Sequence, residues 1–194
     1  MNKNIEHYVF HKENFLDEKY CENCIDELNR GIVWKKHEWY SATEDEYSQL
    51  SAELEPDMLE RMLPENIEKI NNFIISSLHS TLHEYINKFK FDWFNSWTGY
   101  TAIKFIRYSA GQTMHPHCDH IHSMFDGERK GIPVLSIIGI LNDDYEGGEL
   151  IMFEDKKIDI KKGDLLIFPA NFLYPHEITP VTRGVRYSYT SWVW

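Results

Sequence analysis

The chain has few cysteines and no long apolar run. Only three of its 194 residues are cysteine, and this odd number argues against a disulfide framework and agrees with a reducing compartment. No stretch approaches the roughly 20 apolar residues of a membrane-spanning helix. The segment Met1 to His7 is too polar for the core of a secretory signal. We therefore expect a cytoplasmic protein without a membrane partner.

Positive charge is also scarce. The sequence contains 20 Lys and Arg residues against 31 Asp and Glu residues, which gives a formal net charge of -11 at pH 7. Binding to a phosphate backbone normally needs a clustered basic surface that releases counterions. We therefore expect no nucleic-acid partner.

The length fits one domain, residues 1–194, with a core large enough to bury most of the apolar surface. No internal repeat or low-complexity tract divides it. The first part, residues 1–99, is predicted to be mostly helical support and an N-terminal extension, and residues 100–194 are predicted to form a β-rich core. The oligomeric state stays open.

Cys21 and Cys24 have the spacing of a redox or zinc motif. A second cysteine pair is absent from the sequence, and both residues fall within a run of helical periodicity, Phe15 to Arg30. We interpret them as two half-buried thiols on a helix, with a metal or redox role as the alternative hypothesis.

Apolar spacing predicts two helices in the first half. The first follows Phe15 to Arg30, and the second, longer one begins at Pro64 and continues to Phe89 with apolar residues at steps of three and four. Trp34 to Tyr40 could form a strand, while Ser41 to Pro56 has no clear period and is predicted to be a surface loop.

The pattern changes after Trp97 to short β-rich segments separated by glycine turns. Helices followed by many short strands favour a β-sandwich or barrel flanked by helices. The predicted fold class is therefore mainly β with flanking α-helices. The predicted strands are Thr101 to Ser109, Pro133 to Asn142, Glu149 to Phe153, Lys157 to Ile160, Asp164 to Pro169 and Gly184 to Val193.

The residues that carry chemistry are His117, Asp119 and His176. Residues two apart on an extended strand point to the same side, so His117 and Asp119 can reach one ion if the chain bends at Cys118. His176 must arrive from a distant segment, after a turn bounded by Pro169 and Pro175. Two imidazoles and one carboxylate make the facial triad of non-haem Fe(II) oxygenases, which leaves coordination positions open.

Arg186 follows His176 by ten residues, and Ser188 follows two further on. A planar guanidinium can hold a carboxylate through two parallel charge-assisted hydrogen bonds, and its charge does not titrate near neutrality. This pattern predicts a site for a carboxylate-bearing co-substrate. The alternative is an outward-facing arginine paired with an acidic residue.

Further motifs surround these residues as one pattern, and with them residues 100–194 resemble the 2-oxoglutarate- and Fe(II)-dependent oxygenases, in particular the prolyl 4-hydroxylase-like branch. They are Tyr108, Gly111, the segment Gly147 to Leu150 and the segment Gly163 to Pro169.

The resemblance implies a double-stranded β-helix, the jelly-roll or cupin-like fold, with the metal at one open end. It implies that His117, Asp119 and His176 ligate Fe(II), and that Arg186 and Ser188 bind the far carboxylate of 2-oxoglutarate. The remaining reactant is O2, and ascorbate is the expected reductant.

A hydroxyl that some relatives use is missing here. They place a tyrosine on the strand before the Asn-Asp turn, where this sequence has Ile137 to Leu141. Binding of 2-oxoglutarate must then depend on Arg186 and Ser188, with Tyr108 or Ser136 as a further hydroxyl. Tyr108 could equally be a core tyrosine, which would also need a partner for its hydroxyl.

A Gly-bounded polar segment, His120 to Gly131, follows the ligand motif and contains Arg129 and Lys130. We interpret it as a substrate-covering loop in which these two cations contact substrate. The extra histidines His115, His120 and His122 are assigned no metal role, because polar loop residues near a wet site account for them.

The resemblance implies hydroxylation of a C–H bond with release of succinate and CO2, most simply on a prolyl residue of a protein or peptide. Two other hypotheses remain open. One is hydroxylation of a free amino acid or other small metabolite, and the other is a non-catalytic cupin-like binding module. An enclosed pocket would favour the small molecule, and an open groove the peptide.

Overall fold

The computed structural model describes residues 4–30, 33–41, 46–49, 53–59, 65–90, 97, 99–119 and 133–194. Within these residues the chain forms one short 3-10 helix, two α-helices and fifteen short strands. They are η1 (Ile5–Tyr8), β1 (Phe10–Lys12), α1 (Glu18–Leu28), β2 (Trp34–Lys36), β3 (Trp39–Ser41), β4 (Glu46–Ser48), β5 (Asp57–Leu59), α2 (Glu65–Phe89), β6 (Lys104–Tyr108), β7 (Met114–His117), β8 (Leu135–Ile140), β9 (Glu146–Gly147), β10 (Leu150–Met152), β11 (Lys156–Ile158), β12 (Leu165–Pro169), β13 (His176–Ile178), β14 (Val181–Arg183) and β15 (Arg186–Val193).

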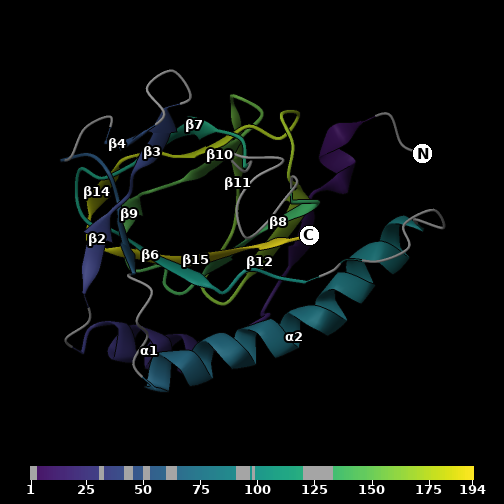
Figure 1. The fold of residues 1–194 in the computed structure, drawn as a ribbon, viewed down its shortest axis with the longest axis horizontal. Helices are drawn as coiled ribbons and strands as arrows, with labels where there is room; N and C mark the ends of the chain where they lie inside the picture. Colours follow the sequence, from purple (N-terminus) through teal and green to yellow (C-terminus); the bar gives the residue numbers. More distant parts are fainter. Residues whose placement is uncertain are drawn as a thin grey trace.

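Two antiparallel sheets form the body of the molecule. The larger sheet has seven strands in the order β1-β12-β8-β15-β6-β5-β2, and the smaller has four in the order β11-β10-β13-β7. Figure 1 shows them as two layers, with α1 and α2 lying along the outer side of the larger sheet. Two further strand pairs, β14-β9 and β3-β4, flank these layers.

Helix α1 begins later than the sequence pattern predicts. The Asp17 side chain accepts a hydrogen bond from the Tyr20 amide at 2.7 Å, and this N-cap fixes the first turn at Glu18. The buried face of α1 carries Cys21, Cys24 and Leu28, each with no exposed surface. Burial raises the pKa of Cys21 to about 11 and that of Cys24 to about 12, so both thiols stay protonated and the interpretation as helix-packing residues is favoured.

Helix α2 occupies the length predicted for it, although Pro64 lies outside the described residues. Its buried stripe packs against one face of the larger sheet, where it forms a single apolar core with α1. The stripe comprises Ile67, Ile70, Ile74, Leu78, Leu82 and Tyr85. In the described part of the chain, no helix combines the length and apolarity needed to cross a membrane.

The larger sheet is apolar on both faces. On β8, Ile137 packs toward the helices while Ile138 and Ile140 belong to a second core between the sheets. On β12, Ile167 and Phe168 divide in the same way. This alternation follows from the two-residue period of a strand, and it leaves one face of the sheet free to line the space between the layers.

The first half of the chain contributes more strand than its sequence indicates. β1 pairs with β12, and β5 joins β2 to β6, so three strands from this half extend the larger sheet at both edges. The predicted strand at Trp34 to Tyr40 is divided into β2 and β3. The segment predicted as a loop, Ser41 to Pro56, contains the strand β4. Pairing with partners distant in sequence creates these strands, and local periodicity does not record such pairing.

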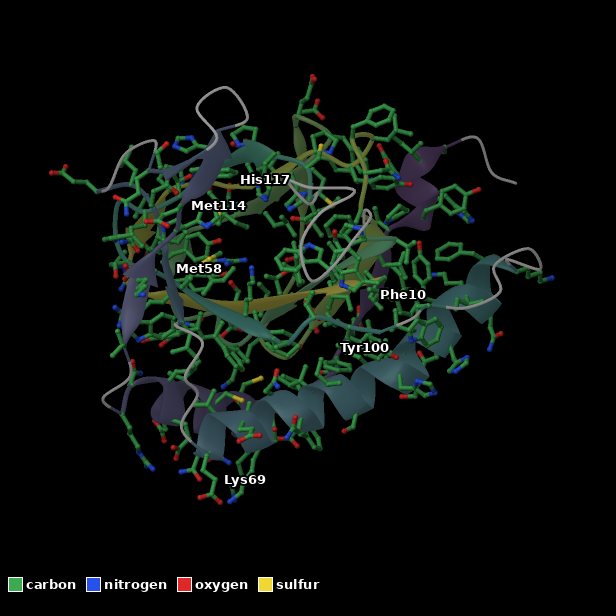
Figure 2. All side chains as sticks on the ribbon, viewed as in Figure 1. Phe10, Met58, Lys69, Tyr100, Met114 and His117 are labelled. Atoms are coloured by element: carbon green, nitrogen blue, oxygen red, sulfur yellow. The ribbon has the colours of Figure 1, made fainter. Side chains whose placement is uncertain are left out.

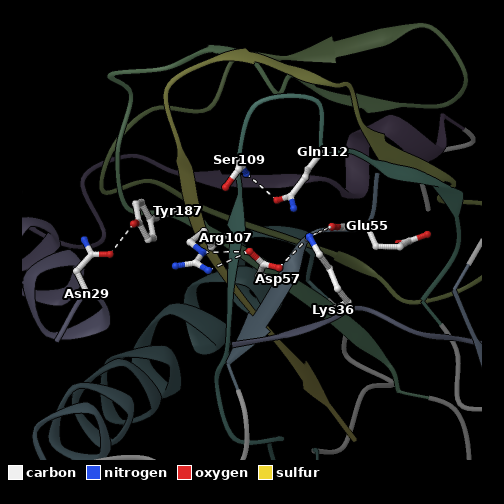
Figure 3. Close-up of polar contacts among 8 residues, drawn as sticks. All are labelled: Asn29, Lys36, Glu55, Asp57, Arg107, Ser109, Gln112 and Tyr187. Carbon is white, nitrogen blue, oxygen red and sulfur yellow. Dashed lines mark hydrogen bonds and ion pairs between the residues drawn. The ribbon is translucent and has the colours of Figure 1, made fainter. Parts of the chain in front are cut away.

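Ion pairs stabilise the edge of the larger sheet that β5 and β2 add next to β6. Asp57 on β5 receives hydrogen bonds from Arg107 on β6 at 3.1 and 3.2 Å, and its other oxygen lies 3.0 Å from the Lys36 ammonium on β2 (Figure 3). The Arg107 guanidinium also lies over the Trp34 ring at 4.6 Å. One carboxylate thus links three neighbouring strands that form the rim of the cavity described below.

We predict that Leu78→Ala destabilises the protein by about 2–5 kcal/mol, because it removes a fully buried side chain between α2 and the sheet. Asn72→Ala, at an exposed position of the same helix, should change stability by about 0.5 kcal/mol or less. Urea unfolding followed by circular dichroism measures both. Equal losses for the two variants would mean that α2 does not pack on the sheet as described.

Candidate active site

A cavity of about 460 Å³ lies between the two sheets. Figure 2 shows Met58, Met114 and His117 pointing into this space, whereas Lys69 lies on the far side of α2. Strands β6 and β15 supply one wall mainly through their even-numbered residues, although Tyr189 also lines the cavity. The even-numbered residues are Lys104, Ile106, Tyr108, Arg186, Ser188, Thr190 and Trp192.

The two histidines of the predicted triad are cross-strand neighbours. His117 on β7 pairs with His176 on β13, and their ring centroids lie 4.4 Å apart. The next pair along is Met114 with Ile178, so three steps on β7 oppose two on β13. This bulge reverses the side-chain alternation of β7 and turns both His117 and Met114 into the cavity.

Both imidazoles are oriented by main-chain carbonyls. His117 Nδ1 lies 2.7 Å from the His115 carbonyl oxygen, and His176 Nδ1 lies 3.1 Å from that of Tyr174. A carbonyl oxygen only accepts hydrogen bonds, so each Nδ1 carries the proton and each unprotonated Nε2 is the nitrogen that can act as a metal ligand. This is the arrangement of a metal-binding histidine whose second nitrogen is held by its surroundings.

Asp119 completes the group. Its two carboxylate oxygens lie 3.8 Å from His117 Nε2 and 3.8 Å from His176 Nε2, respectively. Among the described residues, these three side chains form the one group of three or more His, Cys, Asp or Glu residues whose ligand atoms could hold a metal ion. The distances exceed those of hydrogen bonds, and a small contraction brings two nitrogens and one oxygen to a single ion. This donor set fits Fe(II).

Aromatic rings support both imidazoles from behind. Phe168 contacts His176 edge to face at 5.2 Å, and Trp39 contacts His117 in the same manner at 5.3 Å. Trp39 is itself held by Glu55, a fully buried carboxylate whose Oε1 accepts a hydrogen bond from the indole nitrogen at 3.0 Å. These contacts restrict rotation of the two imidazoles.

Arg186 is the largest fully buried side chain, with 1% of its surface exposed. Its Nη1 donates to Ser188 Oγ at 2.8 Å, and its Nε has no hydrogen-bond partner. Among the described residues no carboxylate lies within ion-pair distance of it. Gly148 makes room for this side chain, since a Cβ there would lie 3.0 Å from Arg186 Cδ. A buried cation without a counter-ion is costly, and an anion in the cavity would compensate it.

Tyr108 lies directly opposite Arg186 in the pairing of β6 with β15, and the guanidinium is centred 5.0 Å from its ring. Burial raises the pKa of the phenol to about 12, against a smaller lowering by Arg186. The phenol therefore remains a hydrogen-bond donor at neutral pH. Tyr108 belongs to the core between the sheets and also lines the cavity. It can therefore be a core tyrosine and still offer its hydroxyl to a co-substrate, so the two hypotheses from the sequence are compatible.

Other residues singled out in the sequence lie elsewhere. The Ser136 hydroxyl is buried without a partner and does not line the cavity. His115 contributes its carbonyl oxygen to the site through His117 and is outside the group of possible metal ligands. The two loop cations Arg129 and Lys130 lie outside the described residues, as do His120, His122 and Trp93.

Several cavity residues were not predicted from the sequence. Trp39 and Met58 reach the cavity from the first half of the chain, and Trp192 lines it from β15 with the Lys104 ammonium 4.9 Å from its ring. The alternation of β15 places Trp192 on the same face as Arg186 and Ser188, and this periodicity was the available signal. For Trp39 and Met58 the sequence contained no comparable signal.

His37 also lines the cavity. Its Nδ1 lies 3.3 Å from Met58 Sδ and its ring meets Trp39 edge to face at 4.7 Å. Burial lowers the pKa of His37 to about 4, with smaller contributions from the positive charges of His117 and Lys104. His37 is therefore neutral at physiological pH.

Comparison with known proteins agrees with this geometry. Residues 103–194 match the family model of the 2OG-Fe(II) oxygenase superfamily. Among curated relatives, a PKHD-type hydroxylase of Burkholderia ambifaria is 36% identical over 95 residues, which cover 46% of this chain and 40% of the relative. The chain thus matches about two fifths of the length of such relatives. The family recognised from the sequence is confirmed for residues 103–194, and this family implies Fe(II), 2-oxoglutarate and O2.

Solved structures share the fold over nearly the whole chain. The viral collagen prolyl hydroxylase of Paramecium bursaria Chlorella virus-1, in its 2OG complex, has a TM-score of 0.65 and 18% identity, covering 96% of this chain and 94% of that one. A prolyl hydroxylase from Trichoplax adhaerens, bound to a hypoxia-inducible-factor peptide fragment, has a TM-score of 0.66 and 20% identity, covering 96% and 83%. The predicted fold class, a double-stranded β-helix with flanking helices, is confirmed.

The lowered pKa of His37 predicts an acid-dependent loss of stability. In the unfolded chain an unperturbed histidine takes up a proton below about pH 6.5, whereas in the folded state His37 does so only near pH 4. Stability is therefore greatest above pH 6.5 and falls as the pH drops toward 4. In His37→Phe this fall should be smaller, because the residue no longer titrates.

Urea unfolding at pH 7 and pH 4.5, with chelator present so that metal binding does not contribute, measures this difference. The other histidines contribute equally to the pH dependence of stability in both proteins, so their contribution cancels in the difference between wild type and variant. An identical pH dependence for wild type and His37→Phe would contradict the burial of His37.

Proposed function

We propose that this chain is an Fe(II)- and 2-oxoglutarate-dependent dioxygenase that hydroxylates a C–H bond of a prolyl residue in a protein or peptide. His117, Asp119 and His176 would hold the iron, and Arg186, Ser188 and Tyr108 would hold 2-oxoglutarate. The proposal rests on one observation above all. A possible three-ligand metal site and a buried arginine, which has no counter-ion among the described residues, open into the same cavity.

Fe(II) bound with 2-oxoglutarate and O2 would supply oxidative hydroxylation, in which the substrate C–H becomes C–OH while 2-oxoglutarate loses CO2 and leaves as succinate. The protein's part is to position and shield the reactants. The guanidinium of Arg186 and the hydroxyl of Ser188 can bind the far carboxylate of 2-oxoglutarate, which satisfies the free Nε and compensates the buried charge.

The phenol of Tyr108 stays protonated and can donate a third hydrogen bond to the same co-substrate. The carbonyl oxygens of His115 and Tyr174 keep both imidazoles in the tautomer that presents Nε2. Apolar residues that line the cavity would limit the access of water to the reacting centre. They include Ile106, Met114, Ile138 and Ile178.

Two features support a prolyl substrate. The fold neighbours include prolyl hydroxylases, one of them bound to a peptide fragment. The cavity also exposes the indoles of Trp39 and Trp192, and aromatic-lined grooves are surfaces on which proteins bind proline-containing segments.

A small metabolite is the second candidate, because a cavity of about 460 Å³ falls within the usual range for small-molecule sites. A non-catalytic binding module is the third hypothesis, and turnover would exclude it.

We expect the purified chain to form succinate from 2-oxoglutarate with Fe(II) and ascorbate, and proline-containing peptides to increase the rate. His176→Ala should abolish this activity because it removes a metal ligand, and a chelator should abolish wild-type activity reversibly. Peptide mass spectrometry would locate a gain of one oxygen. Stimulation by free amino acids but by no peptide would favour the second candidate, and metal binding without succinate would favour the binding module.

Arg186→Gln should raise the KM for 2-oxoglutarate by about 10- to 150-fold, which corresponds to the loss of about 1.5–3 kcal/mol of charge-assisted hydrogen bonding. Arg183→Gln is the matched control. Arg183 is three residues away, 74% exposed and paired with Glu146, so its KM should stay near the wild-type value. Steady-state assays at varied 2-oxoglutarate concentration separate KM from kcat. Similar KM values for the two variants would rule out the proposed carboxylate site.

A further inference from the structure

A second group of metal-binding side chains lies on α2, outside the cavity. His79 and His83 are four residues apart on this helix, and both are exposed. Residues at this spacing lie on the same face, one turn apart. Their Nε2 atoms are 3.3 Å apart, and their ring centroids are 4.7 Å apart at an interplanar angle of 77°. Nitrogen atoms of both imidazoles therefore approach one point above the helix.

The spacing of these nitrogens matches that of two ligands on one ion. Zinc binds imidazole nitrogen at about 2.0–2.1 Å with tetrahedral geometry, so two such ligands lie about 3.3–3.4 Å apart. The observed 3.3 Å between the Nε2 atoms requires little movement of either ring. Two histidines at i and i+4 on one helix face also form the pair of zinc ligands in metalloprotease helices.

The other nitrogen of His79 is held in place as in established metal sites. His79 Nδ1 lies 3.3 Å from the Tyr100 hydroxyl, and the Trp97 indole donates to the same hydroxyl at 2.7 Å. Figure 2 places Tyr100 on the side of α2 that faces the sheet. Tyr100 forms an isolated β-bridge with Val193, which anchors this hydroxyl to the end of β15. Such a second partner fixes the ring and increases its basicity toward a metal.

We propose that His79 and His83 form a zinc-class metal site on the surface of α2, with Tyr100 orienting His79 and water filling the remaining positions. In the metal-free protein the two imidazoles share one hydrogen bond, in which one Nε2 donates and the other accepts. Binding replaces this hydrogen bond by the ion, and the donor imidazole moves its proton from Nε2 to Nδ1, so both histidines bind as neutral ligands. The bound ion then links His79 and His83 across one turn of α2. Because Tyr100 contacts His79 and pairs with Val193, the same contacts connect this turn to the end of β15. The proposal does not depend on the oxygenase activity.

The test measures zinc binding to the full-length chain in which the cavity site is disabled by Asp119→Ala and His176→Ala. Equilibrium dialysis should give one zinc per chain in this background. Adding either His79→Ala or His83→Ala should remove that zinc. Asn87→Ala, at an exposed position one turn beyond His83, is the matched control and should retain it. Circular dichroism verifies that each variant is folded.

Tyr100→Phe tests whether the Tyr100 hydroxyl contributes to zinc binding, or whether two adjacent surface imidazoles are sufficient. It keeps the shape of the side chain but removes the hydroxyl beside His79 Nδ1, so zinc affinity should fall about 10- to 100-fold. Zinc should also raise the melting temperature of the disabled-cavity protein, and this shift should disappear with His83→Ala.

Two results would overturn the proposal. One is the absence of bound zinc in the folded protein with the disabled cavity, and the other is zinc that persists after His79→Ala or His83→Ala. If the disabled-cavity protein does not fold, wild type should bind two zinc ions and His83→Ala one. An unchanged wild-type stoichiometry in His83→Ala would then equally refute the site.

Discussion

The seven-stranded sheet is buried on both faces, and this double burial determines which side chains can reach the cavity. One face packs on α1 and α2, and the apolar residues at alternate positions of β6, β8, β12 and β15 belong to that core. The intervening residues face the smaller sheet. On β15 this rule directs Tyr187 toward the helices, and Arg186 and Ser188 into the cavity. A shift of one residue in register would exchange the two sets and eliminate the site.

The polar groups of the cavity are oriented mainly by fixed parts of the fold. Main-chain carbonyls set the tautomers of His117 and His176, and Ser188 on the same strand holds one nitrogen of Arg186. Among the residues that the structure describes, the charge of Arg186 has no counter-ion and its Nε has no hydrogen-bond partner. Such preorganisation orders the binding groups before a ligand arrives, so less free energy is spent on fixing them during binding.

Much of the fold could be predicted because the decisive signals are local. The stripe of α2 and the β-rich second half follow directly from apolar periodicity. The strands β1 and β5 could not be predicted, because each is only three residues long and exists through pairing with β12 and β6. Glu55 is a similar case. Its sequence surroundings indicate a polar surface loop, yet the structure buries it completely against Trp39.

The sequence by itself determined the identity and order of the candidate site residues, since His117, Asp119, His176, Arg186 and Ser188 form a pattern that depends only on spacing. The tertiary structure decided how they meet. The bulge between β7 and β13 turns His117 into the cavity, and Arg186 is buried with no counter-ion in the part of the chain that the structure describes. The tertiary structure also brings the Tyr100 hydroxyl next to His79 on α2. Periodicity along one segment reports which face a residue occupies, but contact between distant segments depends on register and packing, which only the folded chain establishes.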